Sequence, residues 1–107
     1  MTDENLLVSV VIPTYKRSVN LQRAITSVLK QSYQHIEILV VDDNDAETEH
    51  RKKTELFMQQ YNNYPCVFYI KHATNLNGAA ARNTGINNSK GDLIAFLDDD
   101  DEWEESK

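Results

Sequence analysis

Four consecutive aspartates, Asp98–Asp101, directly follow a run of five apolar residues, Leu93–Leu97. Such an apolar run predicts a buried strand. The carboxylates cannot follow that strand into the core, because an unpaired buried charge is too costly. The sequence therefore predicts a cluster of carboxylates at an edge of the fold. Hard oxygen ligands of this kind suit Mg²⁺ or Mn²⁺, ions that usually bind together with substrate phosphates.

A run of acids in this position is also typical of a solvated tail. Two features favour a binding site instead. The acids follow the apolar run without a linker, and a second polar group, Asp42–Asp45, follows the apolar run Ile36–Val41 in the same way. In open α/β sheets, ligands bind outside the carboxyl ends of the strands. We therefore expect an enzyme that acts on a phosphorylated substrate.

The charge of the chain is concentrated in one place. The 107 residues suffice for one domain and carry a net charge of −6. Seven of the 17 acidic residues lie between Asp98 and Glu105, and the remaining 10 nearly balance the 11 lysines and arginines. Because no basic patch interleaved with aromatic residues is present, we expect no binding of nucleic acid.

The single cysteine, Cys66, lies in an apolar run and is expected to pack in the core. One cysteine allows no disulfide within the chain, which fits a reducing compartment. No apolar run approaches the ~18 residues of a membrane span, and the polar first residues do not resemble a signal peptide. We expect a cytoplasmic location, with attachment to the inner face of a membrane only through segments outside this sequence.

Strand and helix patterns alternate along the chain. The expected strands are Leu6–Ile12, Ile36–Val41, Cys66–Lys71 and Leu93–Leu97, and the expected helices run from Ser18 or Asn20 to about Gln31, over Ala46–Gln60 and over Ala79–Asn88. This alternation predicts an α/β fold with three layers, a mostly parallel sheet between helices. Pro13 is expected to end the first strand, because it has no N–H to donate. Leu56 and Phe57 are the expected apolar contacts of the second, mainly polar helix.

Three loops should meet at the carboxyl edge of this sheet: Pro13–Arg17, Asp42–Asp45 and Asp98–Asp101. The first loop offers an aromatic ring and cations, and the other two offer carboxylates. The ring can stack on a nucleobase, and a carboxylate can accept a hydrogen bond from a base or a ribose. A second carboxylate group can hold the metal ion that neutralises a diphosphate. The arrangement predicts a pocket for a nucleoside diphosphate.

Four segments together resemble family 2 glycosyltransferases, which are inverting enzymes with the GT-A fold. They are Ser9–Tyr15 (SVVIPTY), Ile38–Asp43 (ILVVDD), Ala81–Ile86 (ARNTGI) and Phe96–Trp103 (FLDDDDEW). Each motif is weak alone, but four in this order and spacing are specific. The resemblance covers almost the whole chain and implies transfer of a sugar from a nucleotide-diphosphate sugar, with a UDP-sugar as the expected donor, in polysaccharide biosynthesis.

The resemblance also implies roles for individual residues in nucleotide binding. Thr14 and Tyr15 would line the base pocket, and Pro13 would shape their loop. Asp43 would hydrogen-bond the base, with Asp42 beside it. Lys16, where the family often has asparagine, and Asn44-Asp45, where it often has glycine-serine, depart from the pattern, and the second departure leaves the identity of the base open.

The family's metal motif, aspartate-any-aspartate, corresponds to Asp98-Asp99-Asp100. By resemblance, Asp100 would ligate Mn²⁺ or Mg²⁺ directly, and Asp98 would face the ribose or the water shell of the metal. Asp99 is counted with the nucleotide-binding residues. Arg82 would approach the donor diphosphate or brace the metal loop, although it could equally be a surface cation bonded to nearby carboxylates.

An inverting transfer needs a general base, which the family places well downstream of the metal motif. No catalytic base is therefore identified within residues 1–107, and we expect these residues to be the donor- and metal-binding part of a longer domain. Such a partial domain could pair with a second copy to cover an exposed sheet edge.

Other functions are weighed against this one. A non-catalytic nucleotide-binding or interaction module with the same fold would have the same pocket without turnover. A phosphotransfer receiver domain would use Asp42 and Asp43 as its acidic pair, but too few residues follow them for such a domain. A Rossmann dehydrogenase is excluded, because no G-x-G-x-x-G follows the first strand. The histidines His35, His50 and His72 are scattered and are expected at the surface.

Overall fold

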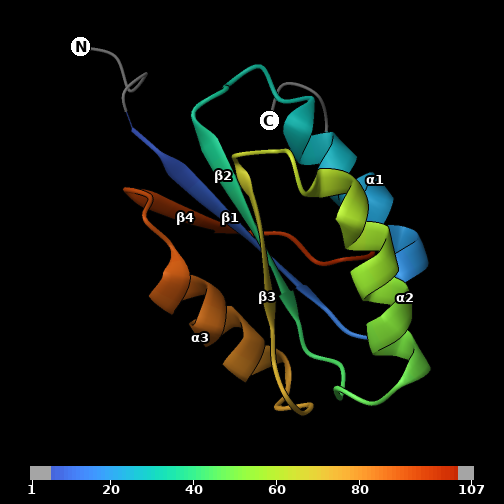
Figure 1. The fold of residues 1–107 in the computed structure, drawn as a ribbon. Helices are drawn as coiled ribbons and strands as arrows, with labels where there is room; N and C mark the ends of the chain where they lie inside the picture. The colour runs from blue at the N-terminus through green and yellow to red at the C-terminus, as the bar shows by residue number, and fades with distance from the viewer. Residues whose placement is uncertain (1–5, 104–107) are drawn as a thin grey trace.

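The computed structural model describes residues 6–103, which form a parallel sheet between helices (Figure 1). The strands are β1 (Val8–Thr14), β2 (Ile36–Asp42), β3 (Val67–Lys71) and β4 (Leu93–Phe96), and the helices are α1 (Ser18–Leu29), α2 (Glu49–Met58), the short 3₁₀ helix η1 (Gln59–Tyr61) and α3 (Gly78–Asn88). The sheet order is β3-β2-β1-β4, and every adjacent pair is parallel. The predicted α/β alternation is thus confirmed.

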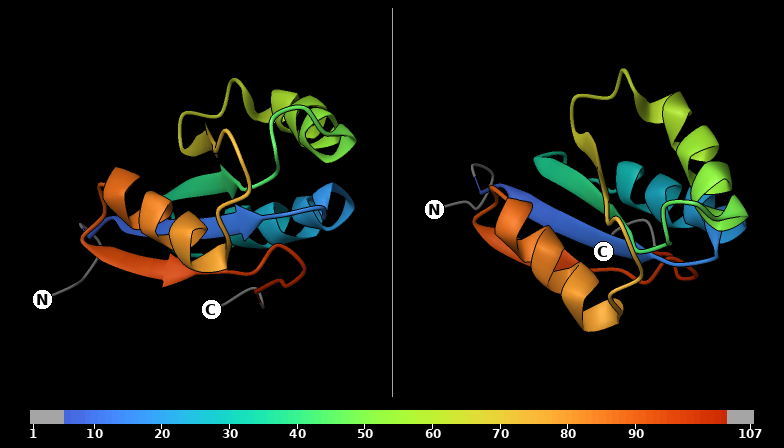
Figure 2. Two further views of the ribbon diagram at one scale, coloured as in Figure 1. Left: turned by 90° about the horizontal axis from the view of Figure 1, so that it is seen from below. Right: turned by 60° about the horizontal axis from the view of Figure 1, so that its bottom comes forward.

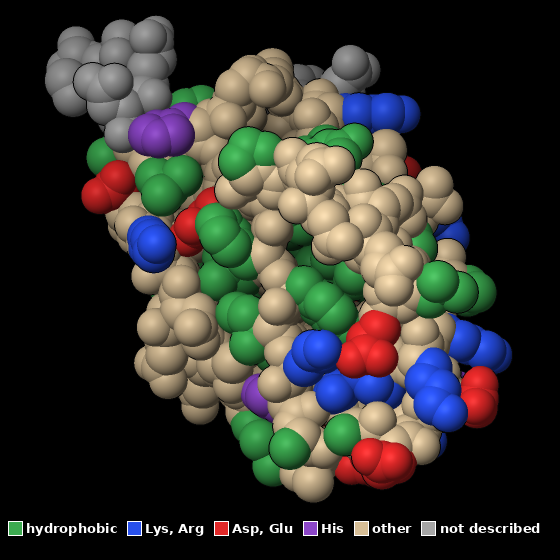
Figure 3. Space-filling view, viewed as in Figure 1, with side chains coloured by type: hydrophobic (Ala, Val, Ile, Leu, Met, Phe, Trp, Pro, Cys, Tyr) green, Lys and Arg blue, Asp and Glu red, His purple; other side chains and the backbone are tan. Residues whose placement is uncertain are grey.

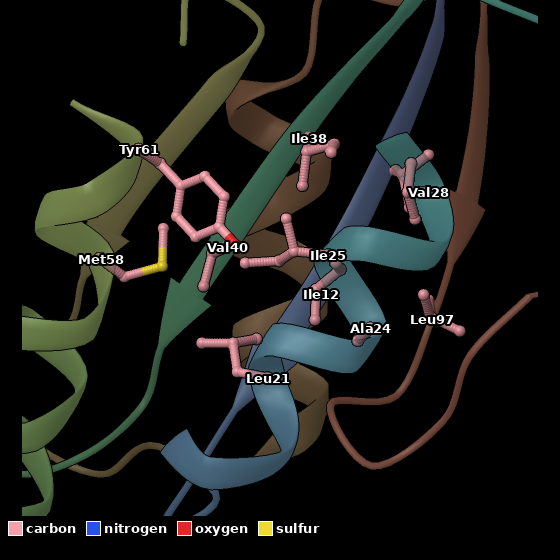
Figure 4. Packing of buried hydrophobic residues seen from close by; sticks show 11 residues of the cluster. Ile12, Leu21, Ala24, Ile25, Val28, Ile38, Val40, Met58, Tyr61 and Leu97 are labelled. Carbon is pink, nitrogen blue, oxygen red and sulfur yellow. The ribbon is translucent and has the colours of Figure 1, made fainter. Parts of the chain in front are cut away.

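The helices cover both faces of the sheet, as two views show (Figure 2). Side chains alternate between the faces of a strand. On one face Val10 and Ile12 of β1 pack against the apolar stripe of α1, which is formed by Leu21, Ala24, Ile25 and Val28 (Figure 4). On the other face Val11 and Val41 pack against Ala81 of α3. The sheet is therefore the middle of three layers. Because its strands are parallel, their carboxyl ends lie at one edge.

Pro13 does not end β1, contrary to the expectation. It pairs with Val41 of β2, and β1 continues to Thr14. The carbonyl of Val11 accepts a hydrogen bond from the Leu97 N–H at 3.1 Å, just past the end of β4. Pro13 lies two residues beyond Val11, so its backbone nitrogen faces the same side as the Val11 carbonyl, where β4 has already ended. The absence of an N–H in Pro13 therefore costs the sheet no hydrogen bond.

The apolar contacts of α2 also differ from the expectation. Leu56 is 69% exposed, whereas Met58 and Tyr61 enter the core and Phe57 packs partly against it. The helix begins at Glu49, and the Thr48 side chain caps it by accepting from a backbone N–H. Its buried face therefore carries Arg51, Thr54 and Met58, and Leu56 lies off that face.

The expectation that Leu93–Leu97 forms a buried strand is wrong for most of its length. Leu93, Ile94 and Phe96 are 40–53% exposed. The reason is that, within residues 6–103, β4 is an edge strand that pairs only with β1, and α3 packs on β1 and β2 instead. The opposite edge is similar, because Phe68 of β3 is 41% exposed and hydrophobic side chains are visible between α3 and α2 (Figure 3).

Candidate functional site

A cavity of about 340 Å³ lies at the carboxyl edge of the sheet. Residues from the ends of β1, β2 and β4, from the loop before α3 and from α3 itself surround it. They are Pro13, Thr14, Tyr15, Arg17, Asp43, Asn75, Asn77, Gly78, Ala81, Arg82, Asp98 and Asp99. Seven of the nucleotide-binding residues predicted from the sequence are among them. Asp42 and Asp100 do not line the cavity.

Asp99 joins the acidic loop, which is formed by Asp98–Asp101, to the end of β1. Its side chain is buried, and its Oδ2 accepts hydrogen bonds from the Thr14 hydroxyl at 2.9 Å and from the Tyr15 N–H at 3.2 Å. Burial raises the pKa of Asp99 above its ordinary value, although these hydrogen bonds and the nearby Arg17 act in the opposite direction. Asp99 stands at the middle position of the aspartate-any-aspartate motif, which the family leaves unspecified, and here it positions the acidic loop.

Two arginines meet the acidic loop from opposite sides. Arg17 Nη1 lies 2.8 Å from Asp100 Oδ2 and 3.3 Å from Asp99 Oδ1. Arg82 Nη2, from α3, lies 3.7 Å from Asp98 Oδ1. The side chains of Arg17 and Arg82 are about half exposed and line the cavity, so the pocket carries cations as well as carboxylates.

Asp43 holds the loop that follows β3. Its Oδ1 accepts from the Leu76 N–H at 2.9 Å, and its Oδ2 accepts from Asn75 Nδ2 at 2.8 Å and from the Asn77 N–H at 3.1 Å. His72 Nδ1 lies 2.8 Å from Oδ1. A carboxylate offers about four acceptor directions, and this environment uses all of them. Recognition of a base by Asp43 stays a prediction, which would require one of these bonds to open.

His72 is a site residue that sequence reasoning missed. It is buried, not at the surface as expected, and its Nε2 lies 2.7 Å from the Thr84 hydroxyl of α3. Together with the Asp43 contact, this ring connects β2, β3 and α3. Its position directly after β3, at the same edge as the other loops, is the sequence signal that could have found it. His35 and His50 are exposed, as predicted.

Asp42 faces away from the pocket, on the side of α2. It is fully buried, and Arg51 Nε lies 3.1 Å from its Oδ2, which also accepts a hydrogen bond from the Tyr69 hydroxyl. Its Oδ1 accepts from the N–H and the side-chain amide of Asn44. Consecutive residues of a strand point to opposite faces, so Asp42 and Asp43 could not both reach one pocket.

The acidic loop offers oxygen ligands but no complete metal cage. Among residues 6–103, no three His, Cys, Asp or Glu side chains come together in an arrangement that could hold a metal ion. Mg²⁺ and Mn²⁺ sites that act on phosphates need fewer, because one or two carboxylates, waters and the phosphates complete the shell. Asp98 and Asp100, whose side chains are 62% and 46% exposed, fit this second kind of site.

Residues 9–107 match the model of Glycosyl transferase family 2. The amylovoran biosynthesis glycosyltransferase AmsB of Erwinia amylovora is 36% identical over 99 residues, which are 92% of this chain and 32% of AmsB. A structure of S. aureus TarS in complex with UDP-GlcNAc is 26% identical with a TM-score of 0.77, over 91% of this chain and 27% of that one. The mannosyltransferase PcManGT of Pyrobaculum calidifontis, in complex with GDP-Man and Mn²⁺, is 20% identical with a TM-score of 0.77, over 96% and 30%.

The parallel sheet between helices and the structural neighbours together define a protein of the GT-A class. The chain belongs to glycosyl transferase family 2. It spans about one third of the length of the curated relatives that it matches. Among the described residues, no helix has the length and apolar character needed to cross a membrane.

Proposed function

We propose that this chain forms the donor-binding part of a glycosyltransferase, which transfers a sugar from a nucleotide-diphosphate sugar to an acceptor hydroxyl with inversion. The observation that carries the proposal is the pocket at the carboxyl edge. There Tyr15 offers an aromatic ring, Arg17 and Arg82 offer positive charge, and Asp98 offers a carboxylate. These groups are complementary to a base, to a diphosphate and to the cation that accompanies it.

The pocket suggests where each part of the donor would bind. The base would lie against Tyr15 near Asp43, and the diphosphate would lie near Arg82 and the amino end of α3. Gly78, the first residue of α3, has no side chain there, and the N–H groups of a helix amino end favour anions. A divalent ion bound by Asp98 and Asp100 would stabilise the nucleoside diphosphate as it departs.

The relatives support a nucleotide sugar as donor. TarS binds UDP-GlcNAc, and PcManGT, which shares the fold, binds GDP-Man with Mn²⁺. AmsB is named for the biosynthesis of amylovoran, which supports a role of this chain in polysaccharide biosynthesis. We propose a UDP-sugar as the donor and Mn²⁺ or Mg²⁺ as the cofactor, in agreement with the oxygen-only ligands of the acidic loop.

Calorimetric titration of the full-length protein with UDP, with and without Mn²⁺, tests the proposal. We expect binding that depends on Mn²⁺ and that Asp100→Ala removes, while the thermal unfolding midpoint stays close to that of the wild type. Asp101→Ala is the matched control, because it removes one charge from the same acidic run without changing Asp98 or Asp100. Unchanged affinity of Asp100→Ala would contradict the metal assignment.

Turnover separates the enzyme from the alternative, a non-catalytic nucleotide-binding module of the same fold. We expect the full-length protein to release UDP from a UDP-sugar when an acceptor is present. Tight binding of UDP without release of UDP from any sugar donor would favour the module.

A further inference from the structure

Arg17 has an unusual position for a cation at the entrance of a helix. It is the N-cap residue of α1, and its guanidinium cannot cap the helix, because it has only N–H donors and no acceptor. Instead, Nη1 lies between two carboxylates, 2.8 Å from Asp100 and 3.3 Å from Asp99. The guanidinium is therefore paired with Asp100, the residue that by resemblance to the family would ligate the metal ion directly.

The backbone before Arg17 fixes this position. Lys16 has a φ of 60°, a left-handed conformation that is uncommon for residues other than glycine. Its N–H donates to Asn44 Oδ1 at 2.9 Å, so the strained turn is tied to the loop after β2. The hydrogen bond from the Asn20 N–H to the Arg17 carbonyl at 3.0 Å then starts α1. Arg17 is thus held at the acidic loop from both sides of the turn.

A guanidinium and a divalent cation that contact the same carboxylate repel each other, and they compete for its oxygens. Asp99 is buried and is also held by Thr14, so it has little freedom to move. Asp100 and Arg17 are both about half exposed and can separate. Arg17 also lines the donor pocket, where a released guanidinium would meet the diphosphate.

We propose that Arg17 is an internal counter-ion of the acidic loop, which competes with the divalent cation for Asp100 and turns to the donor diphosphate once that cation binds. The inference rests on the proposed function and extends it. It assigns Arg17 a positioning role with two opposite effects: Arg17 weakens binding of the metal alone and strengthens binding of the nucleotide with its metal. Arg82 is less suited to this role, because its contact with Asp98 is longer, at 3.7 Å.

The test is Arg17→Gln in the full-length protein, with two titrations. Mn²⁺ alone should bind about two- to fivefold more tightly than to the wild type, the range expected when a partly exposed ion pair is lost. UDP in saturating Mn²⁺ should bind more weakly than to the wild type. Damage to the fold would weaken both, so opposite changes are the signature of the counter-ion. Arg17→Lys keeps the charge and should shift the Mn²⁺ affinity less than Arg17→Gln.

Arg23→Gln is the matched control, because it removes the same charge from α1. Arg23 pairs with Glu102 at 3.4 Å and does not line the donor pocket, so both affinities should stay close to the wild type. The counter-ion proposal alone would be overturned if the wild type binds both Mn²⁺ and UDP but Arg17→Gln binds Mn²⁺ no more tightly than the wild type does. A wild-type protein that binds neither would overturn the proposed function and the counter-ion with it.

Discussion

Gly85 of α3 lies directly against Val11 of β1: a Cβ atom added to Gly85 would be 2.3 Å from Val11 Cγ1 and 2.8 Å from Cγ2. Val11 is fully buried in a central strand and cannot give way. The absence of a side chain at Gly85 therefore sets how closely α3 approaches the sheet. Ala81 and Arg82 of the same helix line the cavity at the carboxyl edge, so this approach also affects the position of one wall of that cavity.

Gly85→Ala should destabilise the protein. Overpacking a core contact costs about 1–3 kcal/mol, and the higher helix propensity of alanine offsets about 1 kcal/mol of that cost. We expect a net loss of up to about 2 kcal/mol in the free energy of unfolding, measured by urea denaturation. Gly78→Ala is the control, since its added Cβ would meet only the end of the Arg82 side chain at 3.4 Å. Equal stability of both variants would contradict the close approach.

The buried pair of Arg51 and Asp42 should be essential for stability. Arg51→Met leaves the fully buried Asp42 carboxylate without its counter-charge, which costs about 3–5 kcal/mol of unfolding free energy when one partner of a buried pair is removed. The double variant Arg51→Met/Asp42→Asn should recover part of that loss in urea denaturation. Lys52→Met is the control, because Lys52 is 67% exposed and its ion pair with Glu49 is 3.7 Å long. A loss no larger than that of Lys52→Met would refute the prediction.

Asp43→Asn should loosen the loop after β3. The amide replaces one acceptor oxygen with a donor that faces other donors, and an unsatisfied buried group costs about 1–3 kcal/mol. Hydrogen exchange should therefore accelerate at the Leu76 and Asn77 N–H groups, which donate to Asp43. Asp45→Asn is the control, because Asp45 accepts from the Asn75 N–H at an exposed position. Unchanged exchange at Leu76 and Asn77 would show that Asp43 does not hold this loop.

Alkaline pH should destabilise the fold through Tyr69. Burial raises the pKa of Tyr69 above its ordinary value, and its hydrogen bond to Asp42 acts in the same direction. The folded state thus prefers the neutral phenol, so this contribution to stability is complete below about pH 10, the unfolded value, and is lost as the pH rises above it. Tyr69→Phe should be less stable at neutral pH but should lose less stability between neutral and alkaline pH, as urea denaturation would show.

A second tyrosine should add to the same alkaline loss. Burial raises the pKa of Tyr61, and the neighbouring Tyr64 raises it further. Tyr61→Phe should therefore also flatten the dependence of stability on pH above about 10. The prediction for Tyr69 is contradicted if Tyr69→Phe and the wild type lose stability equally steeply between neutral and alkaline pH, because the burial of the Tyr69 phenol then contributes nothing to the pH dependence.

The order and type of the elements could be predicted from the sequence, because apolar runs and helical spacing are local. The meeting of three loops at one edge could also be predicted, because parallel strands end on the same side. The burial of β4 could not, since it depends on which strands lie beside it. Its apolar sequence is that of a central strand, yet Leu93 and Phe96 are about half exposed.

The site divides in the same way. The sequence alone determined which loops supply chemistry, and Tyr15, Asp43 and Asp98 do line one pocket. Only the tertiary structure decided what each carboxylate does: Asp42 faces α2, Asp43 holds the loop after β3, and Asp100 is paired with Arg17. The partners of Asp43 and Asp100 lie far apart from them in the chain. For all three aspartates, the direction of the side chain depends on which elements cover each face of the sheet, and a local sequence pattern does not contain that information.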